Sequence, residues 1–378
     1  MIIEFHLNNK CNLRCTYCYQ HYKSHDSMSL ETGKQIIDTL FPTINKDTYK
    51  NYFKDIDSFS DDPDNPLEFS FFGGEALLDV DLIDEIMTHF VKVTNGEFKN
   101  YIISIGTNGI LLSTKKVEAF SEKWLDHIRY DVTVDGNKEF HDTCRKFENG
   151  EGSFDIAYEN FIKYNKLYGN AHVPLTAKLT VSPENIAYFA DAYKFLDNLE
   201  VFINFNFACG KQSEWSDENI NICKSQLRLV SDYILEKYGH TQNSILVFDN
   251  TKLGTDCTIS SCGTEGDRIS IDWNGDIFTC QMFSSTSIHD GSYKPLGNVF
   301  DGIDANQLKL NEFSITQREM IYPKSCDGCR AKRMLCEQCP AESYELFGDV
   351  SIADTSRCKP TKILLAEIDR YHRLKNKK

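Results

Sequence analysis

The chain has 378 residues, a formal net charge of -15, 41% hydrophobic residues and 26% charged residues. This length allows about two domains, and the composition is that of an ordinary globular protein. The negative charge argues against a nucleic-acid partner, because phosphate binding needs a basic face, and no apolar run predicts a membrane span or a signal peptide.

The chain also contains 14 cysteines. Without an export signal, this number indicates metal ligation rather than disulfides. Cysteines that bind metals must stay thiolates, so we expect a reducing, cytoplasmic location.

Strand-like and helix-like segments alternate through the first part of the chain. Strands are predicted at 2–7, 67–72, 101–106, 128–134, 173–181 and 199–207. Helices are predicted at 29–42, 79–94, 113–123, 153–167, 184–197 and 217–238. Repeated βα units predict an α/β fold with a parallel sheet and right-handed crossovers, and six units are fewer than the eight of a closed barrel. Residues 46–66 interrupt the alternation as an acidic surface insertion.

The first predicted strand leads into a loop with three cysteines at C-x3-C-x2-C spacing, Cys11, Cys15 and Cys18. A four-iron cube normally takes one cysteine per iron, so three ligands leave one iron open to a reactive ligand. A zinc site is the alternative, since C-x2-C pairs also bind zinc. The spacing and the aromatic Tyr17 resemble the signature of the radical S-adenosylmethionine (SAM) enzymes. The resemblance implies that the open iron binds SAM, and that one electron cleaves SAM to methionine and a 5′-deoxyadenosyl radical that abstracts a substrate hydrogen.

Glycine and polar residues follow the next three predicted strands, at the sheet edge where such folds place their functional groups. They resemble further motifs of the same family: a GGE turn, a TNG turn, and a D-G stretch followed by H-D-x-x-R. The resemblance implies that Glu75 binds the SAM amino group and that Arg145 holds the SAM carboxylate, a role suited to a planar fork of donors. A helix-surface ion pair is the alternative for Arg145. The residues that the resemblance assigns to SAM are Tyr17, Gly73, Gly74, Glu75, Thr107, Asn108, Thr133, Asp135 and Arg145.

From residue 255 onward the cysteines crowd together. The segment DRISIDWNGDIFTC predicts two short strands joined by Asn274-Gly275, a strong two-residue hairpin signal. The cysteines around and after it resemble the SPASM domain, which carries auxiliary clusters in peptide-modifying radical SAM enzymes. The middle cysteines depart from that pattern, because they are separated by six and two residues rather than by five and three.

The resemblance implies three [4Fe-4S] clusters, one that binds SAM and two auxiliary ones. The first auxiliary cluster would be held by Cys257, Cys262, Cys280 and Cys339. The second would be held by Cys326, Cys329, Cys336 and Cys358. Two structural zinc sites are the alternative. The expected architecture is a partial (β/α)6 TIM-like barrel over 1–240, followed over 241–378 by a small Cys-rich SPASM domain with a β-hairpin and a C-terminal helix.

The remaining cysteines, Cys144, Cys209 and Cys223, are predicted to be small buried hydrophobes. Cys209 is also a catalytic candidate, because it follows the sixth predicted strand and could face the substrate. Gln281 is the second candidate. Sulfatase-maturing relatives carry an Asp directly after the cysteine that corresponds to Cys280, and a neutral amide cannot replace it as a general base.

The favoured function is a peptide maturase that forms a thioether, ether or carbon–carbon crosslink within a ribosomally made precursor peptide. Gln281 disfavours the alternative, oxidation of a sulfatase Cys or Ser to formylglycine. Only ten residues precede Cys11, so we expect a separate leader-binding protein, or the barrel itself, to hold the precursor. The expected electron donor is of the flavodoxin or ferredoxin type. An iron–sulfur electron carrier that does not use SAM is a further alternative, which Glu75 and Arg145 disfavour.

Overall fold

The computed structural model describes residues 2–20, 23–41, 66–96, 99–168, 176–199, 201–208, 214–239, 268–284, 293–304, 306, 320–334, 336 and 338–376. Several predictions fall outside these residues: the insertion at 46–66 apart from Pro66, the domain boundary at 240/241, and Cys209, Cys257 and Cys262. The boundary stays a prediction. The chain divides into two compact units. One comprises Met1–Asn12, Tyr19–Asp131 and Ser260–Glu319, and the other comprises Leu13–Cys18, Val132–Ile259 and Met320–Lys378.

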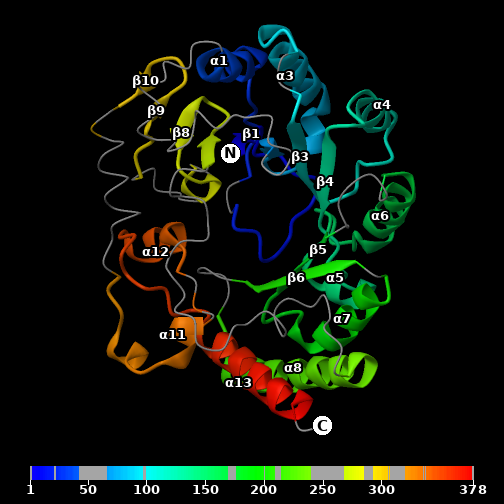
Figure 1. Ribbon diagram of the computed structural model, residues 1–378, viewed down its shortest axis with the longest axis vertical. Coiled ribbons are helices and arrows are strands. Elements are labelled where there is room, and N and C mark those ends of the chain that lie inside the picture. The colour runs from blue at the N-terminus through cyan, green and yellow to red at the C-terminus, as the bar shows by residue number, and fades with distance from the viewer. Residues whose placement is uncertain are drawn as a thin grey trace. The chain divides into compact units, whose positions relative to one another are not determined.

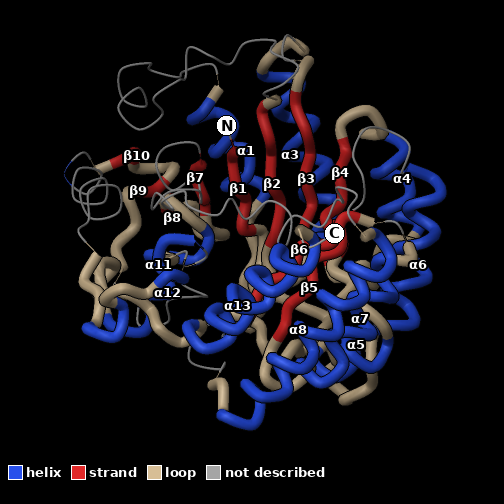
Figure 2. The backbone as a smooth tube through the Cα atoms, turned by 60° about the horizontal axis from the view of Figure 1, so that its bottom comes forward, coloured by secondary structure: helices blue, strands red, loops and turns tan. Residues whose placement is uncertain are grey.

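The first unit is built on an eight-stranded sheet with the order β10-β9-β8-β7-β1-β2-β3-β4 (Figures 1 and 2). β7, β1, β2 and β3 pair in parallel, and β8, β9 and β10 continue the sheet as antiparallel strands. The strands are β1 (Ile2–His6), β2 (Leu67–Phe72), β3 (Tyr101–Thr107), β4 (Ile128–Val132), β7 (Arg268–Ile271), β8 (Asp276–Phe278), β9 (Gly297–Asn298) and β10 (Gly302–Ile303).

Apolar alternation explains the central strands of this sheet. In β2, the sequence LEFSFF buries Leu67, Phe69 and Phe71 on one face, and the residues between them are half-buried. The ring of Phe69 packs against Phe90 of a neighbouring helix, with 4.6 Å between the ring centroids. The helices of this unit are α1 (Leu30–Leu40), η2 (Ala76–Asp79), α3 (Val80–Val93), α4 (Lys115–Lys123) and η4 (Gln281–Phe283).

The second unit contains the parallel strand pair β5 (Thr176–Val181) and β6 (Phe202–Phe207), together with several helices. Its core includes Tyr193, Phe205, Leu227 and Ile368, all of which are buried. The last helix, α13, packs along α8 (Figure 1). The helices are α5 (Lys138–Cys144), α6 (Phe154–Tyr168), η3 (Ile186–Tyr188), α7 (Phe189–Asp197), α8 (Asp217–Tyr238), η5 (Lys324–Cys326), α11 (Arg330–Met334), α12 (Pro340–Phe347) and α13 (Cys358–Lys375).

The structure confirms the predicted α/β class with parallel strands, and each predicted strand and helix of the first part of the chain is present with small shifts at its ends. Helix 184–197 is divided into η3 and α7, and α5 was not predicted. The strands of the described residues do not close into a barrel. No helix in the described part of the chain is long and apolar enough to cross a membrane.

The hairpin β7–β8 is confirmed, but the expected two-residue turn is wrong. The backbone N–H of Asp272 donates to the carbonyl of Asp276 at 2.8 Å, so three residues lie in the loop. Gly275 is the last of them and has φ +89°, a left-handed conformation that glycine adopts without strain. A three-residue loop ending in a left-handed glycine is the next most common hairpin connection.

Candidate active site

The GGE turn follows β2 and lies directly against the chain that enters the cysteine loop. The backbone N–H of Gly74 donates to the carbonyl of Asn8 at 2.9 Å, and that of Glu75 donates to the carbonyl of Lys10 at 2.7 Å. A Cβ atom at Gly74 would lie only 1.9 Å from the Lys10 carbonyl oxygen, and one at Gly73 would lie 2.6 Å from that of Asn8. Both glycines are therefore required for this close backbone approach.

The Glu75 carboxylate is 1% exposed and is bonded to the TNG turn after β3. Its Oε1 accepts a hydrogen bond from the Thr107 hydroxyl at 2.7 Å, and its Oε2 accepts one from the Asn108 backbone N–H at 2.8 Å. The side-chain Nδ2 of Asn108 donates to Asn12 at 2.6 Å and lies 3.9 Å from the Cys11 Sγ. The structure thus brings together Cys11 and three of the residues predicted to bind SAM in the first unit.

Cys15 and Cys18 belong to the second unit, in a segment bonded to the last residue of α5 and to the chain that follows it. The N–H of Arg14 donates to the carbonyl of Lys146 at 2.7 Å, and the N–H of Thr16 donates to that of Cys144 at 3.0 Å. A further bond of 3.2 Å from the Cys18 N–H to the Cys15 carbonyl closes a tight turn between the two cysteines.

Tyr17, Asp135 and Arg145 form one connected group in the second unit. The Tyr17 hydroxyl donates to Asp135 Oδ2 and accepts from Arg145 Nη1 at 3.0 Å. Asp135 Oδ1 accepts the backbone N–H of Thr180 at 3.3 Å. Burial raises the pKa of the Asp135 carboxyl, and the positive charge of Arg145 opposes that shift. Thr133, the remaining predicted SAM contact, precedes Asp135 by two residues and is half-buried.

His141 of α5 is fully buried and forms hydrogen bonds to the backbone of Asp135 and to Ser153, which in turn contacts Arg145. Its Nδ1 accepts the Asp135 backbone N–H at 3.2 Å, and its Nε2 lies 3.0 Å from the Ser153 hydroxyl. That hydroxyl donates to the Arg145 carbonyl at 2.9 Å. Burial, and then the charge of Arg145, lowers the pKa of His141 well below its usual range. The network therefore fits a neutral imidazole that carries its proton on Nε2.

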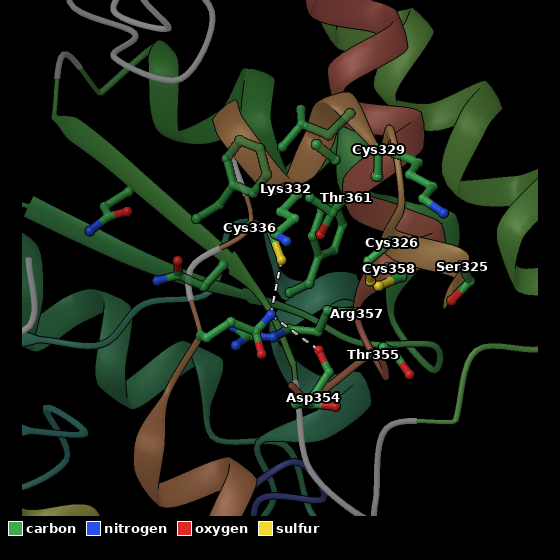
Figure 3. Close-up of a pocket in the computed structure, with 18 residues that line it drawn as sticks. Ser325, Cys326, Cys329, Lys332, Cys336, Asp354, Thr355, Arg357, Cys358 and Thr361 are labelled. Atoms are coloured by element: carbon green, nitrogen blue, oxygen red, sulfur yellow. Dashed lines mark hydrogen bonds between the residues drawn. The ribbon is translucent and has the colours of Figure 1, made fainter. Parts of the chain in front are cut away.

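The four cysteines predicted to hold the second auxiliary cluster line a single cavity of about 710 Å³ (Figure 3). They come from η5, the chain around α11 and the start of α13, and β6 forms another wall with Asn204 and Asn206. Gln338 Nε2 donates to the Cys336 Sγ at 2.9 Å and to the Asp354 carbonyl at 3.2 Å. The lining cysteines are Cys326, Cys329, Cys336 and Cys358.

The thiols of this cavity are suited to a metal group that replaces their protons. Burial raises the pKa of Cys358 to about 11, and the neighbouring Cys336 and Cys326 add to the shift. Metal binding at such thiols releases protons. All cysteines in the described residues are free of disulfides. Within those residues no three Cys, His, Asp or Glu side chains form a group that could hold a single metal ion.

Of the remaining predicted ligands and catalytic candidates, the structure describes Cys280, Gln281 and Cys339. Cys280 is half-buried at the start of η4, and Cys339 is half-buried at the start of α12. The backbone of Gln281 bonds to the buried Glu4 carboxylate. Cys280 and Cys339 were expected to share the first auxiliary cluster with Cys257 and Cys262. Cys257, Cys262 and the catalytic candidate Cys209 lie outside the described residues. Cys144 and Cys223 are buried, as predicted.

Sequence reasoning did not identify two side-chain interactions of the site, the bond from Gln338 to Cys336 and the partners of the Tyr17 hydroxyl. The unusual spacing around Cys336 was the signal for the first, because it places Gln338 between Cys336 and Cys339. No local sequence signal predicts the second, because Tyr17 and Arg145 are 128 residues apart.

Comparison with known proteins agrees with these motifs. The Radical SAM superfamily matches residues 6–196. The serine-type anaerobic sulfatase-maturating enzyme of Bacteroides thetaiotaomicron is 25% identical over 378 residues, which cover 90% of this chain and 82% of that protein. The radical SAM cyclopropyl synthase TigE of Paramaledivibacter caminithermalis is 22% identical over 383 residues, which cover 97% of this chain and 73% of that protein.

A solved structure shows the same fold. Native anSMEcpe with bound AdoMet and Cp18Cys peptide matches with a TM-score of 0.71 at 18% identity, covering 99% of this chain and 98% of that one. The match to the superfamily spans half of the chain and includes the cysteine loop, the GGE turn and Arg145. The chain therefore belongs to the Radical SAM superfamily, a family of enzymes that use SAM and a [4Fe-4S] cluster.

Proposed function

We propose that this protein is a radical SAM peptide maturase that abstracts a hydrogen atom from a ribosomally made precursor peptide and forms a thioether, ether or carbon–carbon crosslink. The observation that carries the choice of crosslinking is Gln281, which follows Cys280 and offers an amide where formylglycine formation needs a base. Structural likeness to anSMEcpe with a bound peptide, and to SuiB bound to precursor peptide SuiA at a TM-score of 0.56, supports a peptide substrate.

The residues around the cysteine loop would bind and orient SAM. In the first unit, the buried Glu75 carboxylate is suited to an ammonium group, and Asn108 connects it to Cys11. In the second unit, the buried Arg145 is suited to a carboxylate. Cys11, Cys15 and Cys18 would hold the cluster, and the cluster with SAM supplies the 5′-deoxyadenosyl radical. The chain itself contributes orientation and a site that excludes water.

The cavity of the second unit would hold the group that receives an electron after hydrogen abstraction. Closing a crosslink removes a pair of hydrogen atoms from the peptide. After the radical has taken the first hydrogen atom, the second must leave as a proton, which passes to solvent, and as one electron. A thiolate-bound iron–sulfur cluster is a suitable acceptor, and four cysteines line this cavity. Asn204 and Asn206 of the same wall carry amides, which can donate to and accept from a peptide backbone.

Formylglycine formation on a sulfatase is the second candidate function. The similarity to the serine-type sulfatase-maturating enzyme covers 90% of this chain, and the anSMEcpe fold covers 99% of it. On this alternative, a group other than residue 281 would remove the substrate proton, because the Gln281 amide cannot.

The two functions are separated by their products. Protein reconstituted with iron and sulfide would be incubated with SAM, dithionite and either a short peptide encoded beside its gene or a sulfatase-derived peptide. We expect 5′-deoxyadenosine and a precursor peptide that has lost a pair of hydrogens and does not react with a hydrazide probe. A hydrazide-reactive aldehyde on the sulfatase peptide would favour the second function instead.

A control in the same experiment tests whether SAM is used at all. A variant with Cys15→Ala and Cys18→Ala should form no 5′-deoxyadenosine. If the unmodified protein, fully loaded with iron, also forms none, an electron carrier becomes the better description. We further propose a flavodoxin or ferredoxin as the electron donor and the cytoplasm as the location. The precursor peptide would be held by a separate leader-binding protein or by the barrel itself.

A further inference from the structure

The contacts of Asp135 do not fit the SAM-binding role that the sequence suggested for it. The carboxylate is fully buried. Its Oδ2 accepts from the Tyr17 hydroxyl and its Oδ1 accepts from the Thr180 backbone N–H. The negative charge of Asp135 also lies against the cation Arg145, so this carboxylate already has a counter-charge within the second unit.

Arg145 uses only part of its guanidinium in the same group. Its Nη1 donates to the Tyr17 hydroxyl at 3.0 Å. Its Nε is buried and has no hydrogen-bond partner in the described structure. A buried guanidinium N–H without an acceptor is costly, and a bound ligand is one of the partners that can satisfy such a group in a native protein. The Nε edge can bind a carboxylate through two parallel N–H bonds.

Tyr17 connects this guanidinium to the cysteine loop. The residue lies between Cys15 and Cys18, and the backbone on either side of Cys15 is bonded to residues 144 and 146. The hydroxyl thus accepts from Arg145 and donates to Asp135.

We propose that Asp135 and the Tyr17 hydroxyl are positioning residues, which hold the Nη1 end of Arg145 so that its Nε edge receives the carboxylate of SAM. This rests on the SAM-binding role given to Arg145 under the proposed function. It replaces the expectation that all three side chains contact SAM, since only Arg145 would do so.

The test combines one variant with two ligands. Tyr17→Phe keeps the ring and removes the hydroxyl. On cluster-loaded protein without peptide, equilibrium dialysis would give the dissociation constants of SAM and of decarboxylated SAM, which lacks the carboxylate. We expect the constant for SAM to rise about tenfold, because Arg145 loses a hydrogen bond that fixes it, and the constant for decarboxylated SAM to change less than twofold.

Two further variants sharpen the result. Tyr188→Phe is the matched control, because Tyr188 is 45% exposed, and it should leave both constants unchanged. Asp135→Asn should also raise the constant for SAM more than that for decarboxylated SAM, because the Tyr17 hydroxyl that fixes Arg145 then loses its carboxylate acceptor.

Three outcomes would overturn the proposal. They are an unchanged SAM constant in Tyr17→Phe, an equal rise for both ligands, and loss of the cluster in that variant, measured by iron content and by the electron paramagnetic resonance signal without SAM. The first two would show that the hydroxyl does not act through the carboxylate, and the third that it serves the loop itself. Because no peptide is present, these results are independent of whether the protein forms crosslinks.

Discussion

Gly74 shows how strongly a single residue can be constrained by the backbone beside it. A Cβ atom there would lie 1.9 Å from the Lys10 carbonyl oxygen and 3.1 Å from the Asn9 carbonyl carbon. Both are backbone atoms in the entry to the cysteine loop, so no side-chain rotation can relieve the clash. The glycine is therefore required by packing, whatever the turn binds.

Gly74→Ala should destabilise the protein by about 1–3 kcal/mol, the usual effect of forcing extra volume into a packed site. Gly106→Ala in β3 is the control, because no atom lies within 4 Å of the added methyl group. Thermal unfolding of the loaded proteins measures the difference. Equal melting temperatures for the two variants would contradict the packing shown here.

Gln338 should tune the potential of the second auxiliary cluster proposed for this cavity. Its amide donates to the Cys336 Sγ at 2.9 Å, and a donor to sulfur stabilises the extra negative charge of the reduced cluster. A bond of about 1 kcal/mol corresponds to about 40 mV in a one-electron couple, so Gln338→Leu should lower the potential by about that amount. Redox titration followed by electron paramagnetic resonance measures it.

Ser325→Ala is the matched control for Gln338→Leu, since Ser325 lines the same cavity and, within the described residues, makes no hydrogen bond to a cysteine sulfur. Its potential should equal that of the unmodified protein. A potential that stays the same in Gln338→Leu would show that the amide does not reach the loaded cluster.

At the scale of elements, α5 is held in place by a histidine that must stay neutral. His141 is fully buried and its pKa is lowered well below the usual range. The unfolded chain therefore binds a proton that the folded chain does not, in the range below the usual histidine pKa of about 6.5. The stability that depends on this residue is present above that pH and is lost as the pH falls.

His141→Gln should therefore flatten the loss of stability on acidification. Between about pH 6.5 and pH 5, the unmodified protein should lose up to about 1.4 kcal/mol per pH unit more than the variant. Unfolding by urea at a series of pH values measures the slopes. Parallel slopes for the two proteins would mean that His141 is not neutral in the folded state.

The elements that sequence predicted well are those with strong periodicity. β2 alternates buried and half-buried residues, and the buried positions of α3 recur at helical spacing. α5 has only seven residues, of which Phe140, His141 and Cys144 are buried, so its pattern is too short to recognise. The length of the β7–β8 loop was also missed, because an Asn-Gly pair fits loops of two and of three residues.

At the scale of the whole molecule, the cysteine motifs predicted which residues belong together better than they predicted how those residues interact. The resemblance to the SPASM pattern grouped Cys326, Cys329, Cys336 and Cys358 into one site, and the four cysteines do line one cavity. The group of Tyr17, Asp135 and Arg145 depends on contacts across 118 and 128 residues, which spacing cannot reveal. Glu75 is likewise bonded to Thr107, 32 residues away.

Metal removal should loosen the part of the second unit that these cysteines connect. A metal group bound by side chains from separate segments stabilises the fold that joins them. After treatment with a chelator, trypsin should cleave after Lys332, beside the cavity, faster than in the loaded protein. Cleavage after Lys123 of α4, which is paired with Asp84 of the first unit, should not change.

Peptide mass spectrometry would give the cleavage rates, and metal analysis of the untreated protein would distinguish iron from zinc. Equal cleavage after Lys332 with and without metal would show that this segment is ordered independently of any metal group.

The pairing of β7 with β1 has a consequence for self-association. β1 would otherwise end the parallel sheet with an open row of N–H and carbonyl groups, the kind of boundary that recruits foreign strands and seeds aggregates. The β7–β8 hairpin pairs with this edge, and β9 and β10 extend the sheet further. The edge strand on this side of the described sheet is therefore β10, which consists of Gly302–Ile303 alone. An edge strand of two residues offers few groups to template another chain, so in the described part of the sheet the segment that leads to Cys280 protects this edge from pairing with a second copy.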